Sequence, residues 1–461
     1  MTADLSFSVR GKRVTVVGAA RSGIAAAELL ARRGASVTLS EMRAHLDEED
    51  RLRQAGVELE LGGHMPATLL RADLVVTSPG VPYRHPLVEA ARHAGVPVIG
   101  ELELASRWLR GRVVAITGTK GKSTTTTLTG RMLEAGGHRV LVGGNIGHAL
   151  SAQVDESTED TIHVVEASSF QLEMTDTFHP WIAVLLNFSP DHLDRHETVE
   201  EYAAAKTRLF ARQTDNDWAV LNADDPGTLE MASVARARRL LFSMHESLTD
   251  GIVIEGDTIV RRAGLEREPL IPVSSIRLIG RHLVADVLAA AAVAWLAGVG
   301  AAAMTRAVEG FSGLEHALEP VADIGGVRFV NDSKATNIEA AKRAIESFES
   351  GVVVILGGKF KGGDFRDLLG PLESRHATVV AIGESRPLIA EALGGRVSLH
   401  EAENMSGAVR TAFASAAPGG TVVLAPACAS FDMFHDYAAR GHAFKQEVRR
   451  LQEEWNVTRE Q

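Results

Sequence analysis

Short runs of aliphatic and β-branched residues recur along the chain, and most of them end in a turn of glycine or polar residues. After many of these turns, apolar residues return with the three- and four-residue spacing of a helix that buries one face. This alternation predicts an α/β fold built on mostly parallel sheets. The predicted strands are residues 13–17, 37–40, 73–77, 96–99, 113–117, 139–142, 162–166, 181–187, 220–222, 328–330, 352–356, 379–383 and 421–425.

The strands fall into three groups, which fits the length of 461 residues because domains typically hold ~150 residues each. We expect domains at residues 1–107, 108–312 and 313–461. One uncharged run, residues 287–304, is long enough to raise the question of a membrane span. Because Gly298 and Gly300 interrupt it, a buried helix followed by a turn is the better interpretation.

Composition excludes several classes of protein. Hydrophobic residues make up 45% of the chain and charged residues 23%, as in soluble globular proteins. The net charge of −11 argues against a nucleic-acid binder. Cys428 is the only cysteine, so neither a disulfide framework nor a cysteine-based metal site is expected. The N-terminus lacks the apolar core of a signal peptide, and we expect a cytoplasmic protein without membrane attachment.

The strongest chemical signal lies after the strand at 113–117, where the turn GTKG at 118–121 leads into Lys122, Ser123 and a helical pattern. Glycines let backbone N–H groups curl around phosphate oxygens, and the helix N-terminus adds partial positive charge. Lys122 would reach the terminal phosphates and the Ser123 hydroxyl would bind Mg²⁺. The loop is shorter than the usual phosphate-binding pattern, since Ile116 stands where the first glycine would fall. The sequence therefore predicts a nucleotide site here.

A second glycine turn follows the first strand, with Gly18 and Gly23 in place but Ala20 at the middle glycine position. This is the start of a Rossmann-like unit with an imperfect dinucleotide fingerprint. A nucleotide-sugar diphosphate, or no ligand at all, is as consistent with it as NAD.

Acidic and imidazole side chains follow two strands of the central group. Glu166 ends one strand and is a candidate Mg²⁺ ligand, because ligands gather at the carboxyl ends of parallel strands; helix capping is the simpler role for Ser168 and Ser169. Residues 189–196 (SPDHLDRH) follow the next strand, and as a cluster they favour a functional site, although each alone reads as surface charge. Lys206 follows on a predicted helix, where exposure is the default.

The C-terminal group carries three polar loops at strand ends. They are residues 331–337 (NDSKATN), the glycine-lysine loop 357–364 (GGKFKGGD), which suits an anion, and residues 426–437. From Lys445 onward the chain reads as a solvated amphipathic helix.

Taken together, these segments resemble the Mur ligases. The motifs that carry the resemblance, in order over nearly the whole chain, are GTKGKSTTTTL, GGNIG, EASSFQLE, SPDHLDRH with YAAAK, NADD, NDSKATN, GGKFKGGDF and APACASFDMF. The resemblance implies a Rossmann-like N-terminal domain for a UDP-sugar, a P-loop-type central ATPase domain and a Rossmann-like C-terminal domain for the incoming amino acid. It also implies a monomer that uses ATP and two Mg²⁺ ions to add D-glutamate to UDP-N-acetylmuramoyl-L-alanine through an acyl phosphate, in peptidoglycan precursor synthesis.

The resemblance further assigns roles to individual residues. UDP-N-acetylmuramoyl-L-alanine would contact Arg21, Ser22, Gly23, Gly80 and Asn145. ATP would bind at Gly118, Thr119, Lys120, Gly121, Lys122, Ser123 and Thr124, with Asp286 and Asp332 as further nucleotide contacts. The metal ligands would be Ser123, Glu166, His192 and a carbamylated Lys206, and Lys334 would lie near the transferred phosphoryl group. Glutamate would be held by Thr336, Lys361, Ser430 and Tyr437, the last at a position where relatives carry Phe.

Four positions depart from the family pattern. Lys120 replaces an asparagine, Leu283 and Asp286 replace two more, and Ala317 stands where the family places an arginine near the γ-phosphate. Losing such a cation usually lowers the rate. Arg281, His316 and Lys120 are the candidates to replace it, and we favour Lys120 because it is the cation gained within the loop.

Other functions are weighed against this one. Sibling ligases that add alanine, diaminopimelate or folate-linked glutamate share the phosphate loop but not NDSKATN followed by PACASFD. An L-glutamate ligase differs only in pocket shape. A non-catalytic nucleotide-binding protein would explain Ala317, but not the retention of Lys122, Glu166, His192 and Lys206. An NAD-dependent oxidoreductase would need the fingerprint that Ala20 breaks.

Overall fold

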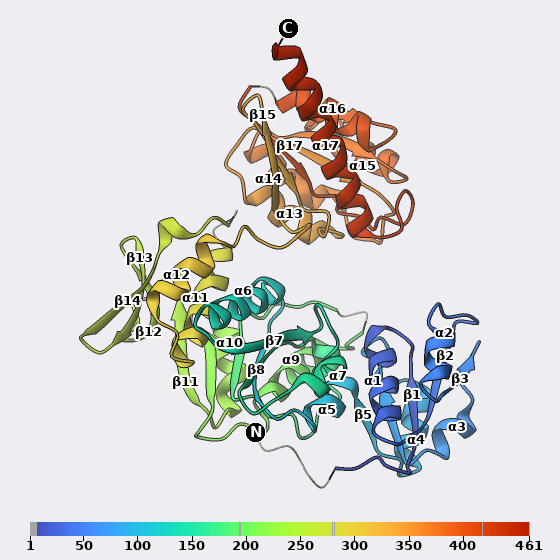
Figure 1. The fold of residues 1–461 in the computed structure, drawn as a ribbon. Coiled ribbons are helices and arrows are strands. Elements are labelled where there is room, and N and C mark those ends of the chain that lie inside the picture. Colours follow the sequence, from blue (N-terminus) through green and yellow to red (C-terminus); the bar gives the residue numbers. More distant parts are fainter. Residues whose placement is uncertain (1–6, 193–194, 279, 281, 417, 461) are drawn as a thin grey trace. The chain divides into compact units, whose positions relative to one another are not determined.

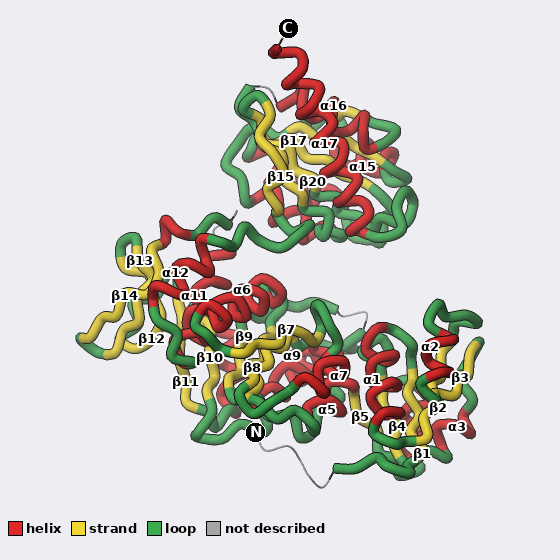
Figure 2. Tube along the Cα trace, viewed as in Figure 1, coloured by secondary structure: helices red, strands yellow, loops and turns green. Residues whose placement is uncertain are grey.

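The computed structural model describes residues 7–192, 195–278, 280, 282–416 and 418–460. The chain forms two compact units, one of Met1–Ile276 with Val284–Gly310 and the other of Arg277–Leu283 with Phe311–Gln461. Three sheets lie in the three expected stretches, each flanked by helices (Figures 1 and 2). The α/β class is confirmed, while the domain limits at 107 and 312 stay a prediction. Among the described residues, no helix is long and apolar enough to span a membrane.

The N-terminal sheet has five parallel strands in the order β3-β2-β1-β4-β5. Its strands are β1 (Arg13–Val17), β2 (Ser36–Glu41), β3 (Val57–Leu61), β4 (Leu74–Thr77) and β5 (Val98–Gly100). The helices are α1 (Arg21–Arg32), α2 (Glu49–Gln54), α3 (Pro66–Leu70), α4 (Pro86–His93) and α5 (Glu101–Ser106). Apolar residues of α1, α2 and α5 pack on one face of the sheet, and those of α3 and α4 on the other. This two-sided burial explains why the strands read as continuous apolar runs.

The central sheet has nine strands in the order β14-β13-β12-β11-β10-β9-β6-β8-β7. They are β6 (Arg112–Thr117), β7 (Arg139–Gly144), β8 (Thr161–Glu166), β9 (Ile182–Leu185), β10 (Trp218–Asn222), β11 (Arg238–Ser243), β12 (Asp250–Glu255), β13 (Thr258–Ala263) and β14 (Glu266–Pro272). The helices are α6 (Lys122–Ala135), α7 (Leu150–Gln153), α8 (Ser169–Leu172), α9 (Val199–Thr207), α10 (Pro226–Met231), α11 (His282–Leu296) and α12 (Ala301–Glu309). The run at 287–304 is thus a helix followed by a turn, as the sequence predicts, and then the start of a second helix, which was not predicted.

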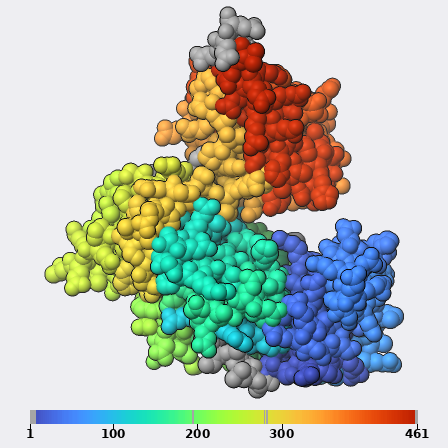
Figure 3. All heavy atoms as spheres, viewed as in Figure 1, coloured from blue at the N-terminus to red at the C-terminus, as the bar shows by residue number. Residues whose placement is uncertain are grey.

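The N-terminal and central sheets belong to the same compact unit. Helices α1 and α7 pack together, and Figure 3 shows blue N-terminal residues directly against teal residues of the central part. Arg32 and Arg33 pair with Asp155 at 3.0 and 2.7 Å across this junction. Residues of these two sheets can therefore be described together.

The C-terminal sheet has six strands in the order β15-β16-β20-β17-β18-β19, of which only β15 is antiparallel to its neighbour. They are β15 (Glu319–Ile324), β16 (Val327–Asn331), β17 (Val352–Gly357), β18 (Thr378–Ile382), β19 (Ser398–Glu401) and β20 (Thr421–Leu424). Helices α13 (Ile338–Glu346), α14 (Leu369–Ser374) and α15 (Arg386–Leu393) cover one face, and α16 (Met405–Ala416) and α17 (Tyr437–Glu460) the other.

Some strands of the structure were not predicted from the sequence. The hairpin strands β12–β14 and the strands β3, β11, β15 and β19 have no counterpart among the predicted strands. Most are exposed at sheet edges or on one face, so their apolar pattern is weak. The amphipathic helix expected from Lys445 onward is present but begins earlier, at Tyr437, and its apolar side buries Phe444, Val448 and Leu451 in the core. Short 3-10 turns complete the chain at Val154–Glu156, Arg208–Phe210, Ala232–Val234, Val273–Ser275 and Phe365–Leu368.

Candidate active site

The phosphate loop connects the carboxyl end of β6 to the N-terminus of α6. Gly118 and Gly121 have φ values of +154° and +80°, which L side chains rarely adopt. The Lys122 ammonium turns back over the loop and donates to the carbonyl oxygens of Gly118 and Thr119, each at 3.0 Å. The loop is therefore pre-shaped around a concave backbone with a cation beside it, which suits a polyphosphate.

Asn187, at the end of β9, fixes this loop and is a residue that the sequence did not reveal as functional. Its Oδ1 accepts hydrogen bonds from the backbone N–H groups of Thr119 (3.1 Å) and Lys120 (2.9 Å), and its Nδ2 donates to the Lys120 carbonyl (3.1 Å). Its position at the end of a predicted strand of the central group was the one feature of the sequence that could have pointed to this role.

Asp286 on α11 packs directly against the loop. A Cβ placed on Gly121 would lie 2.1 Å from Asp286 Oδ1. Burial raises the pKa of the Asp286 carboxyl well above its usual value. A protonated carboxyl can donate one hydrogen bond, as the amide of asparagine can. The replacement of asparagine by Asp286 therefore keeps a donor at this position, which the sequence alone did not indicate.

Glu166 and Asn145 meet at the carboxyl ends of β8 and β7. Asn145 Nδ2 donates to Glu166 Oε1 at 2.7 Å, and Glu166 is almost completely buried. Its second oxygen, Oε2, has no hydrogen-bond partner among the described residues. A buried, unsatisfied carboxylate oxygen is costly unless it meets a cation, so this geometry fits a metal ligand. Ser168 caps α8 in a capping box with Gln171, as expected for its simpler role.

The expectation that Lys206 is an exposed helix lysine is wrong. Its side chain is 1% exposed, and its Nζ donates to the Gly118 carbonyl at 2.8 Å. Burial, followed by the nearby charge of Lys122, lowers the pKa of Lys206 to about 6. The charges of Asp191 and Glu166 act to raise this pKa, but burial outweighs them. The exposure was misjudged because the apolar pattern of this short helix is weak.

His192 lies in the turn between β9 and α9, with a left-handed φ of +56°. Its ring meets Phe170 edge-on, with centroids 5.0 Å apart. The neighbouring Asp191 lies 3.6 Å from the Lys120 ammonium. Leu193 and Asp194 of the same motif lie outside the described residues. The cluster predicted from 189–196 thus does lie beside the phosphate loop.

A cavity of about 700 Å³ opens at the carboxyl ends of β1, β2 and β4. Arg21 and Gly80, which the resemblance assigns to the nucleotide sugar, line it together with Ala20. Ser22 and Gly23 are not among the lining residues, and their contact with a substrate stays a prediction. Gly23 also has a packing role, because a Cβ there would lie 1.9 Å from the Gly18 carbonyl oxygen. Two unpartnered buried atoms, Ser78 Oγ and His85 Nδ1, belong to lining residues that the sequence analysis did not single out. Glu41, Arg43 and His64 also line the cavity.

The second unit brings its own predicted residues together at the ends of β16, β17 and β20. The loops are joined by backbone bonds, from Ala427 N to Ala335 O and between Lys359 and Ala429. Three of the predicted glutamate contacts, Thr336, Lys361 and Ser430, lie on these loops, and Tyr437 follows at the start of α17. Buried Arg440 links them, donating to Ser333 and to the Cys428 carbonyl.

The structure reduces the number of residues that could replace the cation missing at Ala317. Arg281 lies outside the described residues. His316 is buried, accepts a hydrogen bond from Asn331 Nδ2 at 2.9 Å, and has its pKa lowered chiefly by burial, so it is a poor source of positive charge. Lys120, about one-third exposed, remains.

Three family models match the chain: the N-terminal domain of MurD-like Mur ligases at residues 12–100, the Mur ligase middle domain at 116–294, and the Mur ligase glutamate ligase domain at 318–428. The chain belongs to the Mur ligase family.

Close relatives are similar along the entire chain. A protein of Acidobacterium capsulatum named UDP-N-acetylmuramoylalanine--D-glutamate ligase is 48% identical over 444 residues, covering 95% of this chain and 96% of its own. A protein of Koribacter versatilis with the same name is 45% identical, covering 97% and 99%. Among solved structures, the UDP-N-acetylmuramate-alanine ligase MurC of Thermotoga maritima has a TM-score of 0.60 at 18% identity, covering 96% of this chain and 100% of its own. MurF of the same organism, in complex with ADP, has a TM-score of 0.58 at 18% identity, covering 96% of each chain. The structural likeness concerns the fold.

Proposed function

We propose that this chain is a UDP-N-acetylmuramoylalanine--D-glutamate ligase, which joins D-glutamate to the lactoyl-alanine carboxylate of UDP-N-acetylmuramoyl-L-alanine and converts ATP to ADP and phosphate. The observation that carries the proposal is the similarity to relatives of that name at up to 48% identity over 95% of the chain. Three separate features support the proposal: the phosphate loop would bind ATP, the cavity of the N-terminal sheet would bind the nucleotide sugar, and the polar loops of the second unit would bind glutamate. Such an enzyme acts in the cytoplasm in cell-wall precursor synthesis; that it is a monomer stays a prediction.

ATP would bind along the loop 118–124, with Lys122 beside its terminal phosphates. Ser123, Glu166 and His192 would hold Mg²⁺, and the unpartnered Glu166 Oε2 supports this assignment. When bound, the metal neutralises phosphate charge and polarises the phosphoryl group. The buried Lys206 fits the lysine that would be carbamylated, because a neutral amine can react with CO₂. The number of metal ions, predicted as two, rests on the resemblance alone.

The chemistry follows from the weakness of a carboxylate as an electrophile. One oxygen of the substrate carboxylate attacks the γ-phosphorus of ATP, the bond to ADP breaks, and an acyl phosphate forms. The amine of glutamate, having lost a proton, then attacks the acyl carbon and phosphate leaves. Lys122 and the loop amides offset the repulsion between the converging anions. Arg21, Gly80 and Asn145 would orient the nucleotide sugar.

In the second unit, Asp332 would contact the nucleotide and Lys334 would lie near the transferred phosphoryl group. Thr336, Lys361, Ser430 and Tyr437 would bind the two carboxylates of glutamate, since a dicarboxylate is costly to bury without cationic and hydroxyl donors. Lys361 is exposed and Ser430 is buried, so one carboxylate would sit deeper than the other.

The test is phosphate release from MgATP with UDP-N-acetylmuramoyl-L-alanine, comparing D-glutamate, L-glutamate, L-alanine, diaminopimelate and no amino acid. Release that depends on D-glutamate, with a product heavier by one glutamyl residue, is the expected result. Equal turnover with L-glutamate would contradict the stereochemistry, and selective turnover with another amino acid would indicate a sibling ligase. ATP binding without release in any mixture would favour a non-catalytic protein.

A further inference from the structure

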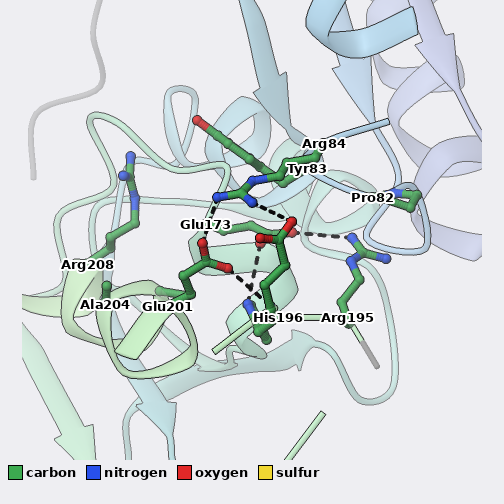
Figure 4. A pocket seen from close by; sticks show the side chains of 11 residues that line it. Pro82, Tyr83, Arg84, Glu173, Arg195, His196, Glu201, Ala204 and Arg208 are labelled. Atoms are coloured by element: carbon green, nitrogen blue, oxygen red, sulfur yellow. Dashed lines mark hydrogen bonds and ion pairs between the residues drawn. The ribbon is translucent and has the colours of Figure 1, made fainter. Parts of the chain in front are cut away.

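A cavity of about 300 Å³ lies within the first compact unit, where residues 82–84, in the loop between β4 and α4, meet residues 195–208 of the central part (Figure 4). Its wall is unusually rich in charge, with Arg84, Arg195 and Arg208 facing Glu173, Glu197 and Glu201. These side chains come from loops and helices that follow strands of the two sheets, and the two ends of the nucleotide sugar would lie beside these sheets. The cavity therefore marks the joint between the substrate pocket and the metal-binding turn.

Arg195 makes the most extensive set of contacts at this joint. Its Nη1 donates to the Gly80 carbonyl at 3.1 Å, and its Nη2 donates to Val81 O at 2.7 Å and to Pro79 O at 3.3 Å. The same Nη2 lies 3.3 Å from Glu173 Oε1. One planar guanidinium thus donates hydrogen bonds to three consecutive backbone carbonyls and to one carboxylate. Among the side chains, only that of arginine offers this planar set of donors.

The ring of Phe170 completes the enclosure. The guanidinium carbon of Arg195 lies 4.7 Å from the Phe170 centroid, and the side chain is only 15% exposed. Phe170 also contacts the ring of His192, at 5.0 Å. Such a stacked and hydrogen-bonded arginine has little freedom, so its position is well defined.

Arg195 connects the loop at residues 79–81 to the turn that contains His192. Gly80 and Val81 line the 700 Å³ cavity of the N-terminal sheet. Arg195 itself belongs to the turn that carries His192, and both Arg195 N and His196 N donate to the His192 carbonyl, at 3.0 and 2.9 Å. A shift of Arg195 would therefore move His192 together with it.

We propose that Arg195 is a positioning residue, which sets the distance between the pocket that would hold the nucleotide end of the substrate and the turn whose His192 would bind the metal. This inference rests on the proposed function. A substrate anchored in the N-terminal pocket reaches the phosphoryl group only if its carboxylate end arrives at the right place. Misplacement by about 1 Å can lower a rate on the order of 100-fold, even when binding is retained.

Arg84 offers a matched comparison within the same joint. It pairs with Glu197 at 2.5 Å and Glu201 at 2.6 Å, and so also links the two sheets. Its side chain is 52% exposed. Among the described residues, Arg84 makes no hydrogen bond to Pro79, Gly80 or Val81, in contrast to Arg195. Exposed ion pairs of this kind contribute little. Removing Arg84 should therefore loosen the surface of the joint without moving the turn at 79–81.

The experiment compares Arg195→Ala, Arg195→Lys and Arg84→Ala with the wild-type full-length chain. Affinity for UDP and for UDP-N-acetylmuramoyl-L-alanine is measured by calorimetry, with and without a non-hydrolysable MgATP analogue, and kcat and KM are measured for each substrate. For Arg195→Ala we expect UDP affinity within about threefold of wild type, kcat lower by roughly 30- to 100-fold, and loss of any effect of the ATP analogue on substrate affinity. Arg195→Lys should recover part of kcat, and Arg84→Ala should change every value less than threefold.

Two results would overturn the proposal. One is an equal, small effect of Arg195→Ala and Arg84→Ala on kcat. The other is a loss of UDP affinity in Arg195→Ala as large as its loss of kcat/KM, since Arg195 would then serve binding alone. If Arg195→Ala does not fold, Arg195→Lys and Arg195→Gln decide by the same criteria. If the proposed function is wrong, the wild-type chain itself shows no turnover. The effect of the ATP analogue on UDP-sugar affinity can still be measured in that case, and it tests the role of Arg195 separately.

Discussion

Lys206 on α9 donates a hydrogen bond to the carbonyl oxygen of Gly118, 2.8 Å away in the phosphate loop. Because burial and Lys122 lower the pKa of Lys206 to about 6, most of this amine is neutral at pH 8. A neutral amine adds CO₂ to form a carbamate and releases one proton, and the remaining N–H can still donate to Gly118. We predict that Lys206 is carbamylated, and that lowering the pH through about 6 removes the modification by protonating the amine.

The measurement is ¹³C NMR of the enzyme in ¹³C-bicarbonate at pH 8, with activity followed in CO₂-depleted buffer. A carbamate resonance should appear in the wild type and be absent from Lys206→Arg, and bicarbonate should restore activity to depleted wild-type enzyme. Lys206→Arg should lose on the order of 100-fold in kcat, since a carbamate that would bind the metal is replaced by a cation. The same resonance in both proteins would refute the assignment.

Lys120 is the remaining described candidate to replace the cation missing at Ala317. Its ion pair with Asp191, at 3.6 Å with both side chains about one-third exposed, is weak enough to be exchanged for a phosphate. We predict that Lys120→Asn raises KM for ATP about tenfold, the effect of losing one charge-assisted hydrogen bond, with little change in KM for the other substrates. Steady-state kinetics check this, with Lys12→Asn as a control for net charge at an exposed site. Unchanged ATP kinetics would rule out the compensation.

The sequence predicted what depends on local pattern and order. The buried parallel strands around β1 and β6, the loop 118–121 and the strand-end position of Glu166 all follow from apolar runs broken by glycine. The burial of Lys206 could not be predicted, because it arises when α9 packs beneath the phosphate loop. Arg195 in the SPDHLDRH motif looked like surface charge for the same reason: its carbonyl partners lie more than a hundred residues earlier in the chain.

The strands β12–β14, at one end of the central sheet, were missed for a different reason. Arg261 and Arg262 of β13 and Arg267 of β14 interrupt the apolar pattern of this antiparallel hairpin, so propensity gives no clear strand signal there. Their place in the sheet is set by pairing with neighbours, which is a tertiary property.

The contact between Gly121 and Asp286 gives a prediction about stability. An alanine at 121 would place its Cβ 2.1 Å from Asp286 Oδ1 at a φ of +80°. We predict that Gly121→Ala lowers the free energy of unfolding by roughly 2–4 kcal/mol through overpacking and backbone strain, and weakens ATP-analogue binding. In the double variant Gly121→Ala/Asp286→Ala the clash is removed and about 1 kcal/mol of strain remains. Denaturant unfolding of both single variants and the double variant tests this; additive changes would contradict direct contact.

Asp332, at the end of β16, should make the stability of the second unit depend on pH. Burial raises its pKa to about 7, although the Leu318 N–H, which donates to it at 3.2 Å, acts in the opposite direction. Between its unfolded pKa near 4 and the folded value near 7, the native state holds a proton that the unfolded chain releases. Stability therefore falls as the pH rises through this window, by about 2 kcal/mol between pH 5 and 7 at ~1.4 kcal/mol per unit. Asp332→Asn, which keeps an acceptor for Leu318, should remove this decrease.

Cys428 provides the probe for that measurement, because it is the only cysteine and is completely buried in the same unit. Its reaction with dithiodipyridine, which proceeds at both pH 5 and pH 7, reports unfolding of this unit in increasing urea. The quantity compared is the difference in unfolding free energy between the two pH values, in wild type and in Asp332→Asn, so that other titrating groups cancel. Asp323→Asn, a change at an exposed carboxylate of β15, should retain the wild-type dependence. An equal pH dependence in wild type and Asp332→Asn would mean that the Asp332 carboxyl is ionised throughout this range.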